Sequence, residues 1–208
     1  MIKVHHLNNS RSQRILWMLE ELGLDYEIIK YFRDKETNLA PESLREVHPL
    51  GKSPVMEDQA VKIAESGAIL EYLTDTYGNG KLKPAAGTPQ ALQYTEWMHY
   101  AEGSAMLPLL LALYVGRLGK AADPLWPRIF GEITNNLTYM NNALKDQPYF
   151  AGTEFTACDV QITFALEGAN ASNALADFPN LKDYLERMQA RPAYKKAIER
   201  GGEYSLGS

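Results

Sequence analysis

Strand-forming segments are confined to the first 64 residues of this chain, and that limit constrains its fold more than any other feature. Ile2–Leu7 and Tyr26–Tyr31 have β-prone compositions, and Val55–Glu57 can pair with Val61–Ala64 as a hairpin. Farther along, the apolar residues recur every three or four positions, which is the helical period. The sequence therefore predicts a small α/β domain followed by an all-helical domain.

Helices are expected between and after these strands. The first has apolar residues at helical spacing, namely Ile15, Met18, Leu19 and Leu22, and Gly23 stands where a C-terminal cap belongs. A weaker helix is expected around Glu42–Val47, and another opens at Glu65-Ser66-Gly67. The predicted order is βαβ, then α, then ββα.

A stretch rich in glycine and proline follows. Residues 78–89 carry three Gly and two Pro in 12 residues, which is typical of a linker. We therefore expect one domain over residues 1–78, a linker over 79–89 and a helical domain over 90–208.

Five helices are expected in the helical domain: Ala91–Leu118 with a bend at Pro108, Trp126–Leu144, one from Thr156, Leu181–Gln189 and one from Pro192. Thr156 and Asp159 have the spacing of a capping box. The tail from Gly201 is expected to be frayed.

Charge and composition exclude several classes of function. The 21 Lys and Arg against 26 Asp and Glu give a net charge of −5, which disfavours a nucleic-acid partner. One cysteine cannot form an internal disulfide, and the first residues lack the apolar core of a signal peptide. The apolar run Ala105–Val115 contains Pro108 and is too short to span a bilayer. We therefore expect a cytoplasmic protein without a membrane span.

No metal site is expected. His5 and His6 are neighbours on a strand and point to opposite faces, so they cannot share one metal ion. One Cys and four His give no zinc pattern, and the acidic residues lack EF-hand spacing.

Three positions could bind an anionic or peptide-like ligand. Ser10 lies at the start of the first helix, where unpaired N–H groups favour negative charge. The Ser53-Pro54 bond in a tight turn is a candidate cis peptide, which would expose the Ser53 backbone to an extended ligand. Glu65-Ser66 at another helix start suits an amino-acid head group. Each also has a structural reading, as a helix cap or an ordinary trans turn proline.

The order of these features resembles the soluble glutathione transferases. The resemblance is carried by Ser10–Arg14, His48–Val55 (HPLGKSPV), Glu65–Tyr72 (ESGAILEY), Gly152–Asp159 (GTEFTACD) and Arg191-Pro192-Ala193-Tyr194. Trp97–Ser104 (WMHYAEGS) looks most like the bacterial and yeast-type subgroup. The resemblance covers nearly the whole chain and implies a thioredoxin-like N-terminal domain followed by an all-helical C-terminal domain.

In this family the reactive thiol belongs to glutathione, the co-substrate. The resemblance to the serine-type classes makes Ser10 the candidate that stabilises the thiolate, with Ser12 as the alternative. No Tyr or Cys lies in the turn after the first strand, which disfavours the tyrosine- and cysteine-type classes. The implied glutathione-binding set is Ser10, Arg11, Lys52, Ser53, Pro54, Glu65 and Ser66. Ser53 stands where many relatives carry an aliphatic residue. A backbone contact with glutathione does not depend on the side chain, so this difference leaves the implied role of Ser53 intact.

The family architecture also implies a pocket for a small hydrophobic electrophile between the domains. Its candidates are His99, Tyr100, Met106 and Tyr114, although such residues at helical spacing also build cores. Glu102 is expected to reach the partner subunit's glutathione in a homodimer. Cys158 is interpreted as a small buried hydrophobe.

The resemblance implies a detoxifying transferase that conjugates glutathione to apolar electrophiles. Two alternatives stay open. One is a glutathione-dependent isomerase, peroxidase or dehalogenase on the same fold, although the isomerase turn carries a cysteine that is absent here. The other is a non-catalytic binding relative, since fold does not determine function.

Overall fold

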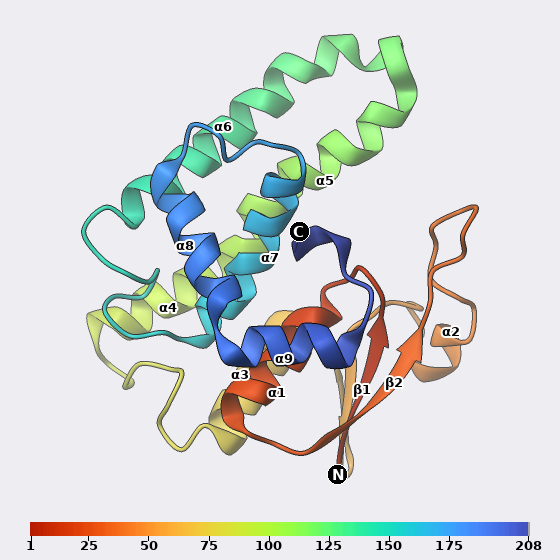
Figure 1. The fold of residues 1–208 in the computed structure, drawn as a ribbon, viewed down its shortest axis with the longest axis vertical. Coiled ribbons are helices and arrows are strands. Elements are labelled where there is room, and N and C mark those ends of the chain that lie inside the picture. The colour runs from red at the N-terminus through yellow and green to blue at the C-terminus, as the bar shows by residue number, and fades with distance from the viewer. Residues whose placement is uncertain (208) are drawn as a thin grey trace. The chain divides into compact units, whose positions relative to one another are not determined.

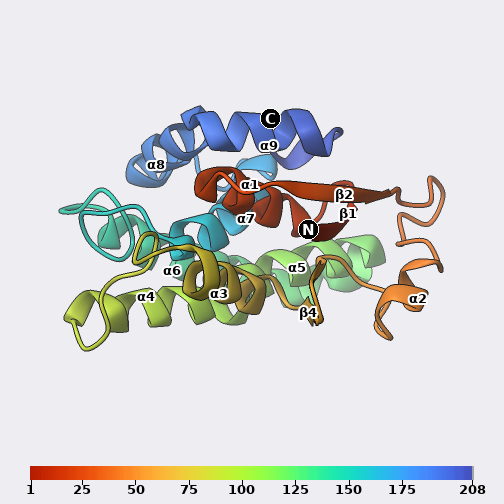
Figure 2. The same ribbon diagram turned by 90° about the horizontal axis from the view of Figure 1, so that it is seen from below.

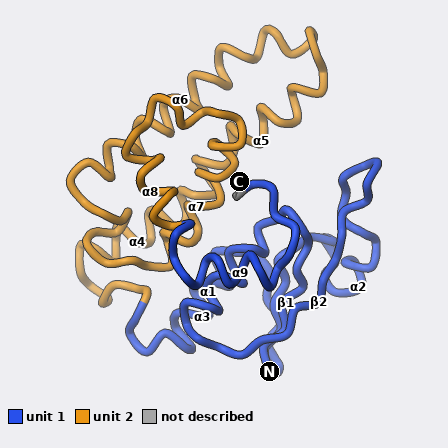
Figure 3. The backbone as a smooth tube through the Cα atoms, in the orientation of Figure 1, with its two compact units in different colours: residues 1–81, 189–208 blue, residues 82–188 orange. Residues whose placement is uncertain are grey.

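The computed structural model describes residues 1–207, which form two compact units (Figure 3). Unit 1 comprises residues 1–81 and the C-terminal stretch from residue 189, and unit 2 comprises residues 82–188. The chain therefore leaves unit 1, builds unit 2 and returns to unit 1. The predicted linker, residues 79–89, spans the passage from unit 1 to unit 2.

A mixed sheet of four strands lies in unit 1 (Figure 1). Its strands are β1 (Ile2–Leu7), β2 (Tyr26–Tyr31), β3 (Val55–Asp58) and β4 (Val61–Ala64), in the order β2-β1-β3-β4. β1 and β2 are parallel, with Ile2 opposite Tyr26, and the other neighbours are antiparallel. A parallel pair needs a crossover connection, which α1 (Ser12–Leu22) provides. The predicted strands and hairpin are confirmed.

Helix α1 is the central helix of unit 1. Its residues Ile15, Leu16 and Met18 are fully buried, and it ends at Gly23, whose φ of 65° is the left-handed cap conformation that glycine adopts without strain. α1 contacts β1, α3 (Ser66–Tyr77) and α9 (Pro192–Gly201), and Figure 2 shows α9 lying along α1. The short helix α2 (Leu44–Val47) precedes the turn that leads to β3.

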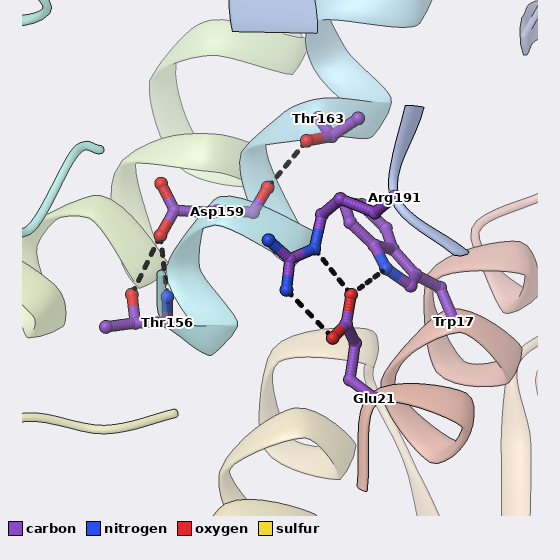
Figure 4. A network of polar contacts seen from close by, with 6 residues as sticks. All are labelled: Trp17, Glu21, Thr156, Asp159, Thr163 and Arg191. Atoms are coloured by element: carbon purple, nitrogen blue, oxygen red, sulfur yellow. Dashed lines mark hydrogen bonds and ion pairs between the residues drawn. The ribbon is translucent and has the colours of Figure 1, made fainter. Parts of the chain in front are cut away.

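Ion pairs join α9 and its N-cap residue to α1. Glu20 lies 2.7 Å from both Lys196 and Arg200. Glu21 accepts from the Arg191 guanidinium at 2.6 and 2.9 Å and from the Trp17 indole at 2.8 Å (Figure 4). A two-pronged Arg–carboxylate contact is directional, so it fixes the angle of α9 as well as its position.

The helices of unit 2 are α4 (Pro89–Tyr100), a π-helix over Ala101–Ala105, α5 (Met106–Val115), a 3₁₀ segment over Gly116–Leu125, α6 (Trp126–Ala143), α7 (Ala157–Ala171) and α8 (Pro179–Ala190), whose last two residues belong to unit 1. The bend expected at Pro108 is a π-helical segment that ends three residues before it. Proline has no N–H and crowds the carbonyl four residues back, here that of Ser104 inside the π-helix. α5 and α6 pack against each other as a hairpin (Figure 1).

The predicted capping box at the start of α7 is present. Asp159 accepts from the Thr156 backbone N–H at 2.8 Å and from its hydroxyl at 3.1 Å (Figure 4). The same carboxylate accepts from the Phe150 N–H at 3.1 Å and the Tyr184 hydroxyl at 2.8 Å. These four bonds lie in the core of unit 2, where Asp159 is fully buried and burial raises its pKa.

One continuous helical stretch among the described residues, Pro89–Ala143, is long and apolar enough by composition to cross a membrane. A single stretch of this kind is weak evidence for a span, because core helices pass the same test. The stretch is also interrupted by the π-helix, by Gly119 with φ 56° and ψ −133°, and by Pro124. Met98 and Ala101 within it are buried in unit 2, whereas Leu107, Leu111 and Leu113 are exposed.

The tail from Gly201 is ordered through Leu206, contrary to the expected fraying. Gly201 is the last residue of α9, and a short 3₁₀ turn covers Ser205–Gly207. The backbone N–H of Ser205 donates to Asn9 Oδ1 at 2.7 Å. The expectation failed because this acceptor lies 196 positions away in the sequence.

Candidate functional site

The turn between β1 and α1 brings two serines and a histidine together. Ser10 Oγ lies 2.8 Å from Ser12 Oγ and accepts from the Ser12 N–H at 3.2 Å. Ser12 Oγ lies 2.8 Å from His6 Nδ1 and accepts from the Leu7 N–H at 3.2 Å. Ser12 is fully buried, whereas Ser10 is 6% exposed. Of the two residues, Ser10 is the more exposed.

His6 is neutral near pH 7. Burial, with a smaller effect of Lys30, lowers its pKa to about 4, while a backbone hydrogen bond with Gly201 raises it slightly. A neutral imidazole carries its proton on one of its two nitrogens, so the direction of the hydrogen bond between His6 Nδ1 and Ser12 Oγ depends on the tautomer. The Ser12 hydroxyl also lies 3.3 Å from the Leu7 carbonyl, a second acceptor for its proton.

The turn before β3 contacts the same region. The Ser53–Pro54 bond is cis, as its sequence position suggested. Ser53 Oγ donates to the His5 carbonyl at 2.8 Å and accepts from the Leu7 N–H at 3.2 Å. Because the Leu7 N–H also reaches Ser12, the two turns are held side by side.

The start of α3 is connected to α1. Arg14, buried in α1, donates from Nη1 to Ser66 Oγ at 2.9 Å. Ser66 thus accepts from a cation and keeps its own proton for another acceptor. Glu65 has φ 70° and ψ 116°, a strained conformation for a residue other than glycine, and its side chain is exposed. Such outliers persist where the surroundings impose them and cluster at binding sites.

Hydrogen bonds within unit 1 therefore connect three of the predicted residues, Ser10, Ser12 and Ser53, through the Leu7 N–H. Ser66 is bonded separately to Arg14 of α1. Lys52 and Glu65 adjoin this set in sequence and are exposed, and Arg11 is the half-buried N-cap of α1. The set offers hydroxyl and backbone donors and exposed charges of both signs. Such a set can bind a zwitterionic, peptide-like ligand and donate to an anion near Ser10.

The protein itself supplies no reactive thiol to this set. Cys158 belongs to unit 2, is fully buried, and has a pKa that burial raises well above its ordinary value. Among residues 1–207, no group of three or more His, Cys, Asp or Glu could hold a metal ion.

The residues predicted for an electrophile pocket all lie in unit 2. His99 is exposed, Tyr114 is 58% exposed and Met106 is buried. Tyr100 donates to Asn136 Oδ1 at 2.5 Å and lines a cavity of about 570 Å³ whose wall includes Leu107. Glu102 is half-buried in the π-helical segment. No contact in the structure brings these residues together as one pocket, so the pocket stays a prediction.

Sequence reasoning missed three residues at this site. From the sequence, His6 is considered only as a metal ligand, and neither Arg14 nor Asn9 is named as a binding residue. A histidine six positions before Ser12 and a cation four positions after Ser10 were visible signals. Neither residue can be assigned to the site from sequence alone, because its contacts depend on the geometry of the turn.

Comparisons of the sequence and of the structure with known proteins point to the same family. The family model "Glutathione S-transferase, N-terminal domain" matches residues 1–75, and "Glutathione S-transferase, C-terminal domain" matches residues 106–192. Glutathione S-transferase 3 of Schizosaccharomyces pombe is 37% identical, over 99% of this chain and 90% of its own. Glutathione S-transferase 1 of Saccharomyces cerevisiae is 28% identical, over 100% and 97%. The crystal structure of a glutathione S-transferase from Actinobacillus pleuropneumoniae superposes with a TM-score of 0.89 at 36% identity, covering 99% of this chain and 95% of that one.

Proposed function

Because the chain belongs to the glutathione S-transferase family, we propose that it conjugates glutathione to small apolar electrophiles and that Ser10 stabilises the glutathione thiolate. Similarity to the S. pombe relative over nearly the whole chain supports transferase activity with glutathione as co-substrate. The hydrogen-bonded turn around Ser10 supports the serine mechanism.

Ser10 has to shift the thiol equilibrium. A free thiol has a pKa of ~8.5, so only a few per cent is thiolate near pH 7. Lowering that pKa by about two units requires roughly 2.7 kcal/mol. One hydrogen bond to a charged group contributes ~1.5–3 kcal/mol, and the N-terminus of α1 adds a favourable dipole. A serine hydroxyl at this turn is therefore about sufficient.

The choice of Ser10 over Ser12 rests on burial and on the partners of each hydroxyl. Ser12 is fully buried and has two internal acceptors within reach, His6 Nδ1 at 2.8 Å and the Leu7 carbonyl at 3.3 Å. Ser10 has no such internal acceptor other than Ser12 Oγ, and a thiolate is a stronger acceptor than a neutral hydroxyl. Ser10 can therefore turn its proton to the ligand, while Ser12 keeps the turn in shape.

The rest of glutathione is assigned to the remaining polar residues. The backbone of Ser53, in the turn before β3, is assigned to the cysteinyl part. Ser66 donates to the γ-glutamyl carboxylate and Glu65 accepts from its ammonium group. Lys52, with Arg11 as a weaker second cation, pairs with the glycine carboxylate.

The electrophile is assigned to the helical unit. His99 and Tyr114 are exposed there and Tyr100 presents an aromatic face, and with Met106 they form the proposed pocket. We also propose a cytoplasmic homodimer with a detoxifying role, in which Glu102 reaches the glutathione of the partner subunit. Light scattering of the purified protein measures the dimer.

The central experiment compares the wild type with Ser10→Ala. Glutathione binding is measured by calorimetry, conjugation with a panel of aryl halides, epoxides and enals, and the pKa of bound thiol by thiolate absorbance. We expect Ser10→Ala to bind glutathione, with a higher thiol pKa and turnover at pH 6.5 reduced at least tenfold. Ser43→Ala is the matched control, because Ser43 is exposed and its side chain caps nothing.

Two results would contradict the proposal. Wild-type turnover retained by Ser10→Ala between pH 6 and 8 would assign the thiolate to Ser12 instead. Failure of the wild type to bind millimolar glutathione would favour a non-catalytic relative. Including a hydroperoxide and a cis-enoyl diacid in the panel separates transferase from peroxidase and isomerase activity.

A further inference from the structure

The last residues of the chain lie against the turn that carries Ser10. Asn9 Oδ1 accepts the backbone N–H of Ser205 at 2.7 Å and its hydroxyl at 3.1 Å. Both partners belong to unit 1. The contact is made one residue before Ser10, so the C-terminal segment, residues 202–206, is bonded to the turn itself.

Asn9 is suited to transmit this contact to the backbone. Its φ of 49° lies in the left-handed region, which asparagine tolerates better than most residues. The Arg33 guanidinium donates to the carbonyl of Asn8 at 3.2 Å and to that of Asn9 at 3.1 Å. The backbone of Asn9 is thus held by Arg33 and its side chain by Ser205. Any rotation of Asn9 would carry the adjacent Ser10 with it.

The end of α9 reaches the same turn by a second route. A Cβ on Gly201 would lie 3.3 Å from His6 Nε2, closer than most Cβ contacts, so Gly201 packs tightly against His6. His6 contacts Ser12, and Ser12 contacts Ser10, each at 2.8 Å. The C-terminal part of unit 1 therefore supports the turn from two directions.

We propose that Asn9 is a positioning residue through which the C-terminal segment, residues 202–206, holds the Ser10 hydroxyl in the orientation that stabilises the thiolate. The proposal rests on the proposed function of Ser10. Hydrogen bonds weaken steeply when donor and acceptor are misaligned. A turn released from Ser205 therefore lets Ser10 sample orientations in which it does not donate to the thiolate.

The test compares Ser205→Pro with Ser205→Ala. Proline removes the N–H that makes the 2.7 Å bond, whereas alanine removes only the hydroxyl that makes the 3.1 Å bond. At pH 6.5 we expect Ser205→Pro to lower kcat roughly three- to tenfold, with a smaller effect from Ser205→Ala. At pH 9.5, where the thiol ionises without help, the deficit should vanish. The KM for glutathione should change less than kcat.

Asn9→Gly gives an independent measurement, because glycine keeps the positive φ and removes the acceptor. We expect Asn9→Gly and the chain ending at Gly201 to show the same pH-dependent loss, and their combination to add nothing further. A deficit that persists at pH 9.5, losses that add fully, or a Ser205→Pro protein with wild-type kcat at pH 6.5 would each overturn the proposal. A wild type that fails to lower the thiol pKa would instead refute the proposed function.

Discussion

His6 should make the protein lose stability as the pH falls from 7.5 to 5. Its pKa is about 4 in the folded chain against an ordinary value of 6.5, mainly because the imidazole is buried. Between these values the unfolded chain binds a proton that the folded chain does not. Stability from His6 is therefore complete above pH 6.5 and is lost as the pH falls toward 4.

The magnitude follows from the same two values. The gap between 6.5 and about 4 corresponds to roughly 3 kcal/mol when fully developed. At pH 5 the proton-binding relation gives a loss of about 2 kcal/mol. That loss is a large fraction of the ~5–15 kcal/mol that stabilises a typical protein.

Urea unfolding of the wild type and of His6→Asn measures this effect. The asparagine does not titrate, and its side-chain amide can hydrogen-bond to Ser12 Oγ in place of Nδ1. We expect His6→Asn to be less stable than the wild type at pH 7.5. The difference in free energy of unfolding between the two proteins should shrink by about 2 kcal/mol at pH 5. His99→Asn, at an exposed position, should follow the wild type throughout. Parallel curves for the wild type and His6→Asn from pH 7.5 to 5 would refute the reasoning.

Three further variants test features of the fold. Asp159→Ala should cost about 3–5 kcal/mol in urea unfolding, because it leaves buried donors without an acceptor; a cost below 1 kcal/mol would refute the role of the capping box. Gly201→Ala should cost about 1–3 kcal/mol, since its Cβ would lie 2.8 Å from Gln13 Oε1. Gly168→Ala in α7 should leave the free energy of unfolding unchanged or raise it, because a Cβ on Gly168 would have no neighbouring atom within 4 Å. Equal changes in stability for Gly201→Ala and Gly168→Ala would contradict the packing argument. Cys158 should react with a thiol reagent only after unfolding, so rapid labelling of the native protein would show that its burial is wrong.

Features that depend on residues close together in the sequence could be predicted. The strands Ile2–Leu7 and Tyr26–Tyr31, the cap at Gly23 and the box from Thr156 to Asp159 all depend on neighbours within a few positions. The three serine-containing turns were recognised for the same reason. Their order along the chain, rather than any one of them, led to the family.

Features that depend on distant partners could not be predicted. The ordered tail needs Asn9 as an acceptor for Ser205, and the neutral state of His6 needs burial beside Gly201. The alternation of a strand correctly separated His5 from His6. It could not show that His6 faces Ser12, because that contact depends on the path of the following turn.

The ion pairs between α1 and α9 have a consequence for synthesis on the ribosome. Glu21 and Arg191 are 170 positions apart in the sequence. At a translation rate of ~5–20 residues per second, their ion pair can form only roughly ten to thirty seconds after Glu21 is synthesised. During that interval unit 2, which is continuous in sequence, can complete its core, while the nascent N-terminal half still lacks the helix that covers α1. The N-terminal part of unit 1, which carries Ser10, is therefore translated first, but its packing is completed last. A chain stalled before Arg191 would expose the apolar face of α1 together with two uncompensated carboxylates, Glu20 and Glu21, to the chaperones and proteases of the cell.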